Sequence, residues 1–159
     1  MKINTLQGGK IIRLIKKMGI KDELVKNISK LSASDKKYKK LQSKLLTKCI
    51  EKYGEEFSEL DKEDKTIKTV EVLNENIDIA KELGEIEQTQ ETIGFDIAFS
   101  VIESAFNKDC EKDLHDILSG LFDKKIKDIQ EQEFNETANQ IMQIIKSETF
   151  AKLFTLATH

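Results

Sequence analysis

The chain has 159 residues, no proline, no tryptophan, seven glycines and a net charge of −3. A chain of this length buries about 70% of its unfolded surface, so it can fold without a disulfide or a metal. The absence of proline removes the commonest helix breaker, and no glycine-bounded strand pattern is present. These features predict an all-α protein and a single helical domain over residues 1–159.

The charge is divided unevenly along the chain. Residues 1–53 carry 15 Lys or Arg against 4 Asp or Glu, whereas residues 54–159 carry 11 against 25. These balances of +11 and −14 indicate an interaction arm, or two parts that attract each other. Within the single domain we distinguish a basic N-terminal part (1–53), an acidic connector (54–65) and a helical core with a C-terminal helix (66–159).

Two short helices are predicted near the N-terminus. The first covers residues 10–18, follows a loose leader of residues 1–9 and ends at Gly19. The second begins at Asp22. Its apolar positions recur at the i, i+4, i+7 spacing of one helix face: Leu24, Ile28 and Leu31.

A clear helix is predicted from Lys36 to Tyr53. Residues 32–35 are expected to cap it, and Gly54 is expected to end it. One face is apolar and consists of Tyr38, Leu41, Leu45, Cys49 and Tyr53. The opposite face carries Lys37 and four lysines that we name the lysine ridge: Lys36, Lys40, Lys44 and Lys48. The helix is therefore expected to dock by one face and to expose the other.

The most apolar segment of the chain is residues 93–106, which follows a helix predicted from Ile67 to Leu83 and closed by Gly84. At about 100° per residue, its apolar side chains leave only one narrow polar wedge. That wedge holds Asp96, Ser100, Glu103 and Ser104. A helix that is apolar almost all round needs neighbours on several sides, so we expect a compact multi-helix domain around this central buried helix.

Further helices are predicted after an exit at Asn107. Asp109 is expected to cap a helix whose buried stripe consists of Cys110, Leu114, Ile117, Leu118 and Leu121. A short piece with Ile126 and Ile129 inward follows, and a helical region begins at about Asn135.

The last predicted helix face lies beyond a break or new cap at residues 147–149. It has the i, i+3, i+4, i+7 spacing and consists of Phe150, Leu153, Phe154 and Ala157. Such a face either folds back on the core or docks on another molecule, and both outcomes remain open. These four residues, followed by the lysine ridge, are the candidate partner-binding residues.

No pattern for catalysis or metal binding accompanies these helices. Five positions, or about 140° of helix rotation, separate His115 from Cys110, and paired Cys or His ligand spacings are absent. The sequence GGK at residues 8–10 lacks the rest of a phosphate-binding loop. We therefore expect no enzymatic activity, cofactor or metal. An uncharacterised helical enzyme is a rival that predicts a concave pocket with perturbed carboxylates.

The sequence favours a cytosolic protein. Lysines and Arg13 interrupt the only early apolar stretch, so no secretory leader is predicted and Cys49 and Cys110 are expected to be buried thiols. No apolar run reaches the roughly 20 residues that a membrane helix needs.

The lysine ridge permits a second interpretation, a helical nucleic-acid-binding regulator that neutralises phosphates. Arg13 is the only arginine of the chain, although arginine is preferred for bidentate contacts to phosphate and guanine. Nucleic acid is therefore the alternative, and an acidic protein surface is the expected partner.

The order of apolar segments is informative as a whole. KIIRLIKKMGIKDEL is followed by IGFDIAFSVIESAF, DLHDILSGLF, KKIKDIQEQEF, NQIMQIIK and AKLF. This order resembles the tail assembly chaperones of long-tailed phages and prophages, particularly those of Gram-positive bacteria. The resemblance is clearest over residues 93–154 and weaker over residues 10–31, and residues 32–90 contribute little to it.

The resemblance implies a small, helical, non-enzymatic protein that binds and solubilises the phage tape-measure protein. Such proteins help to recruit tail-tube subunits, often through a longer form made by programmed frameshift. They act in the host bacterial cytoplasm and are absent from the mature virion. The family has no catalytic residues to carry over. We also expect self-association, in which the lysines of one copy meet the carboxylates of the next.

Overall fold

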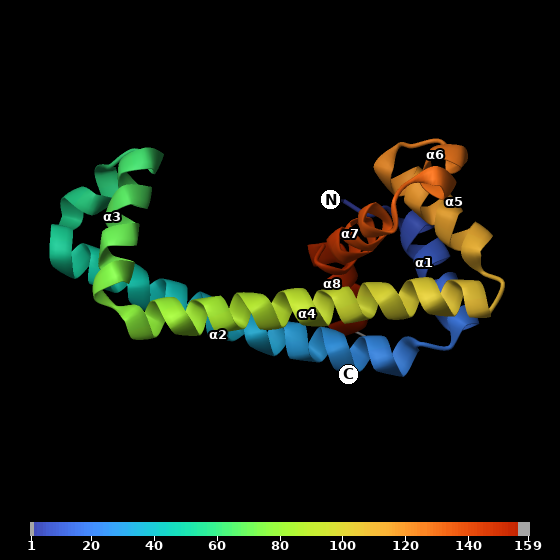
Figure 1. Cartoon of the computed structure of the whole chain (residues 1–159), viewed down its shortest axis with the longest axis horizontal. Helices are drawn as coiled ribbons and strands as arrows, with labels where there is room; N and C mark the ends of the chain where they lie inside the picture. The colour runs from blue at the N-terminus through green and yellow to red at the C-terminus, as the bar shows by residue number, and fades with distance from the viewer. Residues whose placement is uncertain (1, 156–159) are drawn as a thin grey trace. The chain divides into compact units, whose positions relative to one another are not determined.

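A computed structural model of the chain describes residues 2–155. This part holds eight α-helices, one 3-10 helix and no strand, which confirms the all-α prediction (Figure 1). It divides into two compact units: unit 1 consists of Met1–Leu31 and Thr92–His159, and unit 2 of Ser32–Glu91. The division runs through two long helices, α2 (Lys21–Tyr53) and α4 (Ile77–Asn107), and the acidic connector lies inside unit 2.

Unit 1 combines the first part of α2 and the second part of α4 with five further helices. In this unit α1 packs on α5, α5 packs on α6 and α7, and α7 contacts α8. The five helices are α1 (Thr5–Met18), α5 (Glu111–Phe122), α6 (Ile126–Glu131), α7 (Phe134–Ile145) and α8 (Glu148–Thr155).

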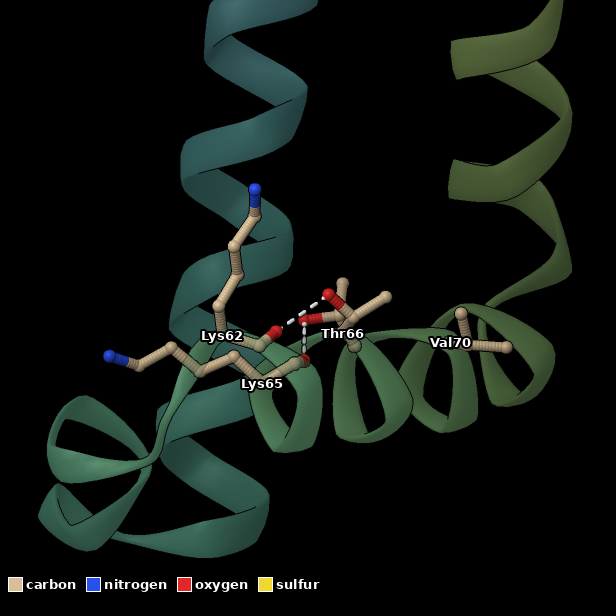
Figure 2. A pocket seen from close by; sticks show the side chains of 5 residues that line it. Lys62, Lys65, Thr66 and Val70 are labelled. Carbon is tan, nitrogen blue, oxygen red and sulfur yellow. Dashed lines mark hydrogen bonds between the residues drawn. The ribbon is translucent and has the colours of Figure 1, made fainter.

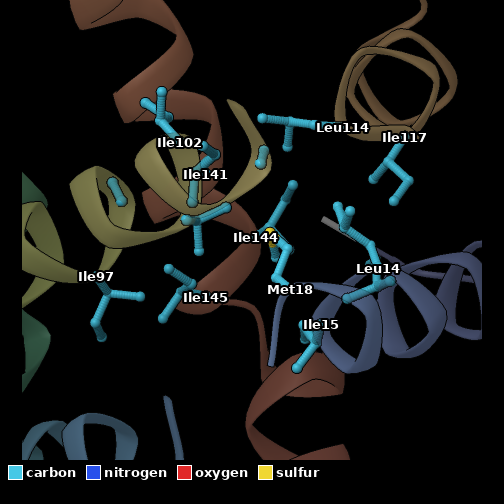
Figure 3. Close-up of a cluster of buried hydrophobic side chains, with 14 of the residues drawn as sticks. Leu14, Ile15, Met18, Ile97, Ile102, Leu114, Ile117, Ile141, Ile144 and Ile145 are labelled. Carbon is cyan, nitrogen blue, oxygen red and sulfur yellow. The ribbon is translucent and has the colours of Figure 1, made fainter. Parts of the chain in front are cut away.

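The core of unit 1 is aliphatic and draws on helices that lie far apart in the sequence. Figure 3 shows side chains of α1, α4, α5 and α7 meeting in one cluster. Its labelled members are Leu14, Ile15, Met18, Ile97, Ile102, Leu114, Ile117, Ile141, Ile144 and Ile145. The buried stripe predicted for α5 is confirmed, since Cys110, Leu114, Ile117 and Leu118 are buried and Leu121 packs against the core as a partly buried side chain.

Two ion pairs join α1 to α5 at the edge of this core. Lys10 Nζ lies 2.6 Å from Asp116 Oδ2, and Lys17 Nζ lies 2.7 Å from Asp113 Oδ2. The predicted attraction between the basic and acidic parts of the chain therefore has a counterpart within unit 1. Both pairs are exposed, so each contributes little to stability.

The N-terminal helix is longer than predicted, because α1 begins at Thr5 and includes Gly8. The backbone N–H of Gln7 donates to Asn4 Oδ1 over 2.9 Å, and the Asn4 N–H donates to Gln7 Oε1 over 3.0 Å. This reciprocal cap offsets the cost of glycine in the first turns. The predicted loose leader is therefore wrong, whereas the predicted end at Gly19 is confirmed by its φ of 74°.

The predicted cap at residues 32–35 is also wrong, because α2 continues through it. Serine and aspartate are tolerated inside a helix, and Asp35 forms an i, i+4 ion pair of 2.8 Å with Lys39. The predicted end of this helix is confirmed: Gly54 has a φ of 73°, and its N–H donates to the Ile50 carbonyl over 2.8 Å.

Unit 2 is formed by the second part of α2, the 3-10 helix η1 (Glu55–Glu59), α3 (Lys62–Glu75) and the start of α4. The buried side chains at its centre are Leu45, Cys49, Phe57 and Val72. This arrangement confirms that the predicted apolar face of α2 docks.

The helix predicted to run from Ile67 to Leu83 is in fact two helices. The break falls at Asn76, whose Nδ2 donates to the Val72 carbonyl over 2.7 Å, and Gly84 lies inside α4. The asparagine side chain takes the place of a main-chain donor, so α3 ends there.

The C-terminal half shows smaller differences. The exit of α4 at Asn107 is confirmed, but Cys110 and not Asp109 occupies the cap position of α5. Ile129 is buried as predicted, whereas Ile126 is exposed.

Candidate interaction surfaces

Three aromatic side chains are exposed along one side of α4. The exposed fractions of Phe95, Phe99 and Phe106 are 46%, 50% and 57%. At 100° per residue these positions fall within about 40° of one another, so they form one line, which we name the Phe stripe. The ring of Phe99 makes an edge contact with that of Phe134 on α7, with centroids 6.3 Å apart. The prediction that neighbours cover this helix on several sides is wrong for this side.

The opposite side of α4 is held firmly by the core of unit 1. Ile97, Ala98 and Ala105 have no exposed surface. Gly94 is buried as well, and the place that a Cβ would take lies 3.3 Å from Met142 Sδ. The Phe stripe therefore stands on a packed helix, which lowers the conformational cost of binding a partner there.

Two carboxylates accompany the Phe stripe. Asp96 and Glu103 lie about 40–60° around the helix from Phe99, both are exposed, and neither forms an ion pair with a described residue. Residues 92–107 contain no lysine or arginine. The face is thus apolar along one line and negative along the next.

The lysine ridge lies in unit 2, on the side of α2 that faces away from the core. Lys36, Lys40 and Lys44 are exposed, and Lys48 is half-buried. None of the four forms an ion pair with a described residue. The structure therefore leaves the four charges available, as the sequence predicts, but does not test whether they bind a partner.

Polar contacts tie α2 to α4 within unit 2. Lys37 Nζ lies 3.6 Å from Glu82 Oε1, and Tyr38 Oη donates to Glu87 Oε1 over 2.9 Å. This hydrogen bond is the main cause that raises the pKa of Tyr38 above its ordinary value of 10.0. The contacts fix the face that α2 turns towards the core and so the direction of the lysine ridge.

The predicted docking face at the C-terminus folds back in part. Phe150 is only 3% exposed and belongs to the core of unit 1. For Leu153 and Phe154 the structure describes the helical backbone of α8 alone, and Ala157 lies outside the described residues. The use of this face in binding stays a prediction, and Phe150 has a structural role.

The cysteines and His115 do not assemble a reactive site. Cys49 and Cys110 are free and buried, as predicted. His115 lies beside Phe106, with ring centroids 6.4 Å apart, and its Nδ1 is buried without a hydrogen-bond partner. Among residues 2–155, no group of three His, Cys, Asp or Glu side chains could hold a metal ion.

A depression of about 490 Å³ lies along α3, and its lining residues all belong to that one helix: Lys62, Lys65, Thr66, Thr69 and Val70 (Figure 2). The hydroxyls of Thr66 and Thr69 donate to the carbonyls of Lys62 and Lys65 over 2.8 and 2.7 Å. No carboxylate or histidine lines this depression, so it lacks an acid–base pair.

Neither a family model, a curated protein nor a solved structure matches the chain. In the described part of the chain, no helix is both long and apolar enough to cross a membrane.

The Phe stripe is the surface that sequence reasoning missed. Hydropathy gives the same weight to the phenylalanines and to the aliphatic residues opposite them, so it does not indicate which side of the helix faces the core. A signal was present in the spacing, since Phe95, Phe99 and Phe106 share one side with Asp96 and Glu103. The small residues that permit close packing lie on the other side.

Proposed function

We propose that the chain is a non-enzymatic, helix-binding protein that serves as a tail assembly chaperone for a phage tape-measure protein. The observation that carries this proposal is the Phe stripe. Three half-exposed phenylalanines in one line, on a helix whose other side is buried, form an apolar surface of the kind that marks protein interaction sites. The resemblance over residues 93–154 includes this helix.

The physical properties of the stripe suit such a client. A long helix-forming chain exposes apolar faces until the tail tube encloses it, and an amphipathic helix packs its apolar face into an aromatic surface. Many copies of a small protein, each covering one short patch, give strong overall binding from weak individual contacts. Weak contacts also allow tube subunits to displace the chaperone during growth of the tail.

In this role the protein acts in the bacterial host cytoplasm and is absent from the mature virion. A longer frameshifted form would recruit the tail-tube protein. The proposed activity is binding, so it requires neither catalytic residues nor a cofactor.

Co-expression with the tape-measure protein, followed by size-exclusion chromatography with light scattering, tests the proposal. We expect the tape-measure protein to become soluble and to co-elute with several copies of the chain. Replacing Phe95, Phe99 and Phe106 by serine is expected to abolish co-elution. A matched control replaces three exposed apolar residues elsewhere in unit 1, Leu6, Ile12 and Ile126, by serine. If the tape-measure protein precipitates alone in the presence of the wild-type chain, the proposal is wrong.

A second candidate, a helical nucleic-acid-binding regulator, is favoured by one observation: the lysine ridge has no ion-pair partner among the described residues. This candidate predicts that the affinity for DNA or RNA falls steeply with salt and that each lost phosphate contact reduces the slope by about one. Fluorescence anisotropy with Lys36, Lys40, Lys44 and Lys48 changed to glutamine tests it. If the wild-type chain and the glutamine variant bound DNA and RNA equally weakly, this candidate function would be ruled out.

A further inference from the structure

A second surface of the same chain complements the Phe stripe. On α2, Leu46 and Ile50 are 51% and 38% exposed and lie one helical turn apart, whereas the other large apolar side chains of this helix are buried or half-buried. They lie within about 40° of each other around the helix. Lys36 and Lys40 of the lysine ridge follow about 40–80° further round than Ile50, and Lys44 lies about 40° beyond Lys40. We name Leu46, Ile50, Lys36, Lys40 and Lys44 the α2 face.

We propose that the α2 face of a second copy of this chain occupies the Phe stripe. The argument rests on charge and apolarity on both sides of the contact. The stripe pairs a line of phenylalanines with two unpaired carboxylates, and the α2 face pairs a line of aliphatic side chains with unpaired lysines. Opposite charges at the edge of an apolar contact fix partner choice and register.

The order of the lines sets the direction of packing. Around each helix, residue positions advance by about 100° per residue in one direction of rotation. In that direction the carboxylates of α4 come after the phenylalanines, and the lysines of α2 come after the aliphatic residues. When the two helices pack antiparallel, the aliphatic side chains of α2 meet the phenylalanines of α4 and the lysines meet the carboxylates. When they pack parallel, the lysines face the phenylalanines and the carboxylates face the aliphatic side chains. The two helices are therefore expected to pack antiparallel.

The lengths agree as well. Phe95 to Phe106 spans about 16 Å of helix, and Lys36 to Ile50 spans about 21 Å. Pairing Ile50 with Phe95 in the antiparallel direction brings Leu46 level with Phe99, and Glu103 then lies two residues from the level of Lys44 and two from that of Lys40. One register thus pairs both aliphatic residues with phenylalanines and places Glu103 between two lysines.

Other occupants fit less well. If the Phe stripe of a second copy packed antiparallel on the first, each Asp96 and Glu103 would meet further carboxylates without a cation between them, and a parallel arrangement would place the carboxylates on phenylalanines; both are unfavourable. A contact between two different surfaces is heterologous, so it continues from copy to copy into rings or open chains. One consequence rests on the proposed function: the same contact would cover the Phe stripe until the tape-measure protein displaces it.

Sedimentation velocity of the full chain over a range of concentrations and salt tests the proposal. We expect the wild-type protein to self-associate, and added salt to weaken the association. Reversing the charges on one surface, by Asp96→Lys with Glu103→Lys or by Lys40→Glu with Lys44→Glu, is expected to raise the dissociation constant by about tenfold or more. Circular dichroism verifies that each variant keeps its helices.

The decisive experiment combines both reversals in one chain. The fourfold variant restores opposite charges across the contact, so its self-association is expected to return towards that of the wild type. The matched control, Lys26→Glu with Lys30→Glu, has the same spacing and charge change at exposed positions of α2 outside the face. It is expected to leave association unchanged.

A wild-type chain that remains monomeric at every concentration, a control that weakens association as strongly as the Lys40 and Lys44 reversal, or a fourfold variant without recovery would overturn the proposal. These measurements contain no tape-measure protein. Self-association can therefore fail while client binding stands, and client binding can fail while self-association stands.

Discussion

Gly94 of α4 faces Met142 of α7 so closely that a Cβ on the glycine would lie 3.3 Å from the methionine Sδ. Gly84, ten residues earlier in the same helix, has no atom within 4 Å of the corresponding position. Glycine in these helix interiors costs about 1 kcal/mol relative to a good helix former. Replacing Gly84 by a good helix former is therefore expected to stabilise the helix. At Gly94 the close contact with Met142 opposes the same stabilisation.

We predict that Gly84→Leu leaves stability unchanged or raises it by up to about 1 kcal/mol. Gly94→Leu is expected to lower stability by about 1–3 kcal/mol, because the larger side chain overpacks the contact between α4 and α7. Urea unfolding followed by circular dichroism measures both. Equal stability of the two variants would contradict the close packing of Gly94.

The all-α fold class was predictable from the sequence, but the boundaries of the helices were harder to predict. The apolar spacings and the absence of proline indicated part of each α-helix, and Gly19 and Gly54 ended their helices as expected. Gly84 did not, because the break falls instead at Asn76, where a side chain bonds to a main-chain carbonyl. Competition between a side-chain donor and a main-chain donor for the same carbonyl depends on the local path of the chain, so the composition of the segment predicts it poorly.

The lysine ridge was predictable because the helix that carries it has one plainly apolar face. The Phe stripe was not, since a helix with apolar residues all round gives no preferred direction until its neighbours are known. Phe150 illustrates the same limit: the i, i+3, i+4 spacing indicates an apolar face but does not decide whether the core or a partner covers it.

The two sides of α4 are expected to differ sharply in their importance for stability. Ile97 is fully buried, so Ile97→Ala is predicted to cost about 2–5 kcal/mol, because it removes buried methyl groups and leaves a cavity. Phe95→Ala, two residues away on the exposed side, is predicted to cost less than about 1 kcal/mol. Urea unfolding compares them. A large cost at Phe95 would mean that the Phe stripe belongs to the core.

Alkaline titration provides a test of unit 2. The chain has two tyrosines and no tryptophan, and hydrogen bonds to Glu87 and Glu71 raise the pKa of Tyr38 and Tyr53 respectively. Each bond favours the neutral phenol, so its contribution to stability is complete below pH 10.0, the ordinary tyrosine pKa, and is lost as pH rises through the folded-state pKa.

Tyrosinate absorbance of the folded protein is therefore expected to show a midpoint above 10.0, which returns towards 10.0 in concentrated urea. Glu87→Gln is expected to lower the pKa of Tyr38 and to leave that of Tyr53 in place. A folded-state midpoint equal to that in urea would contradict both hydrogen bonds.

The role of α8 separates a structural from a binding function at the C-terminus. Ser147 Oγ donates to the Ile144 carbonyl over 2.6 Å and accepts from the Phe150 N–H over 3.3 Å, so it caps α8 and positions the buried ring. Phe150→Ala is predicted to cost about 3–5 kcal/mol, and Ser147→Ala about 1 kcal/mol. Ser32→Ala, at an exposed position within α2, serves as the control and is expected to have little effect. If Phe150→Ala kept full stability and only weakened binding to the tape-measure protein, Phe150 would belong to a docking face and not to the core.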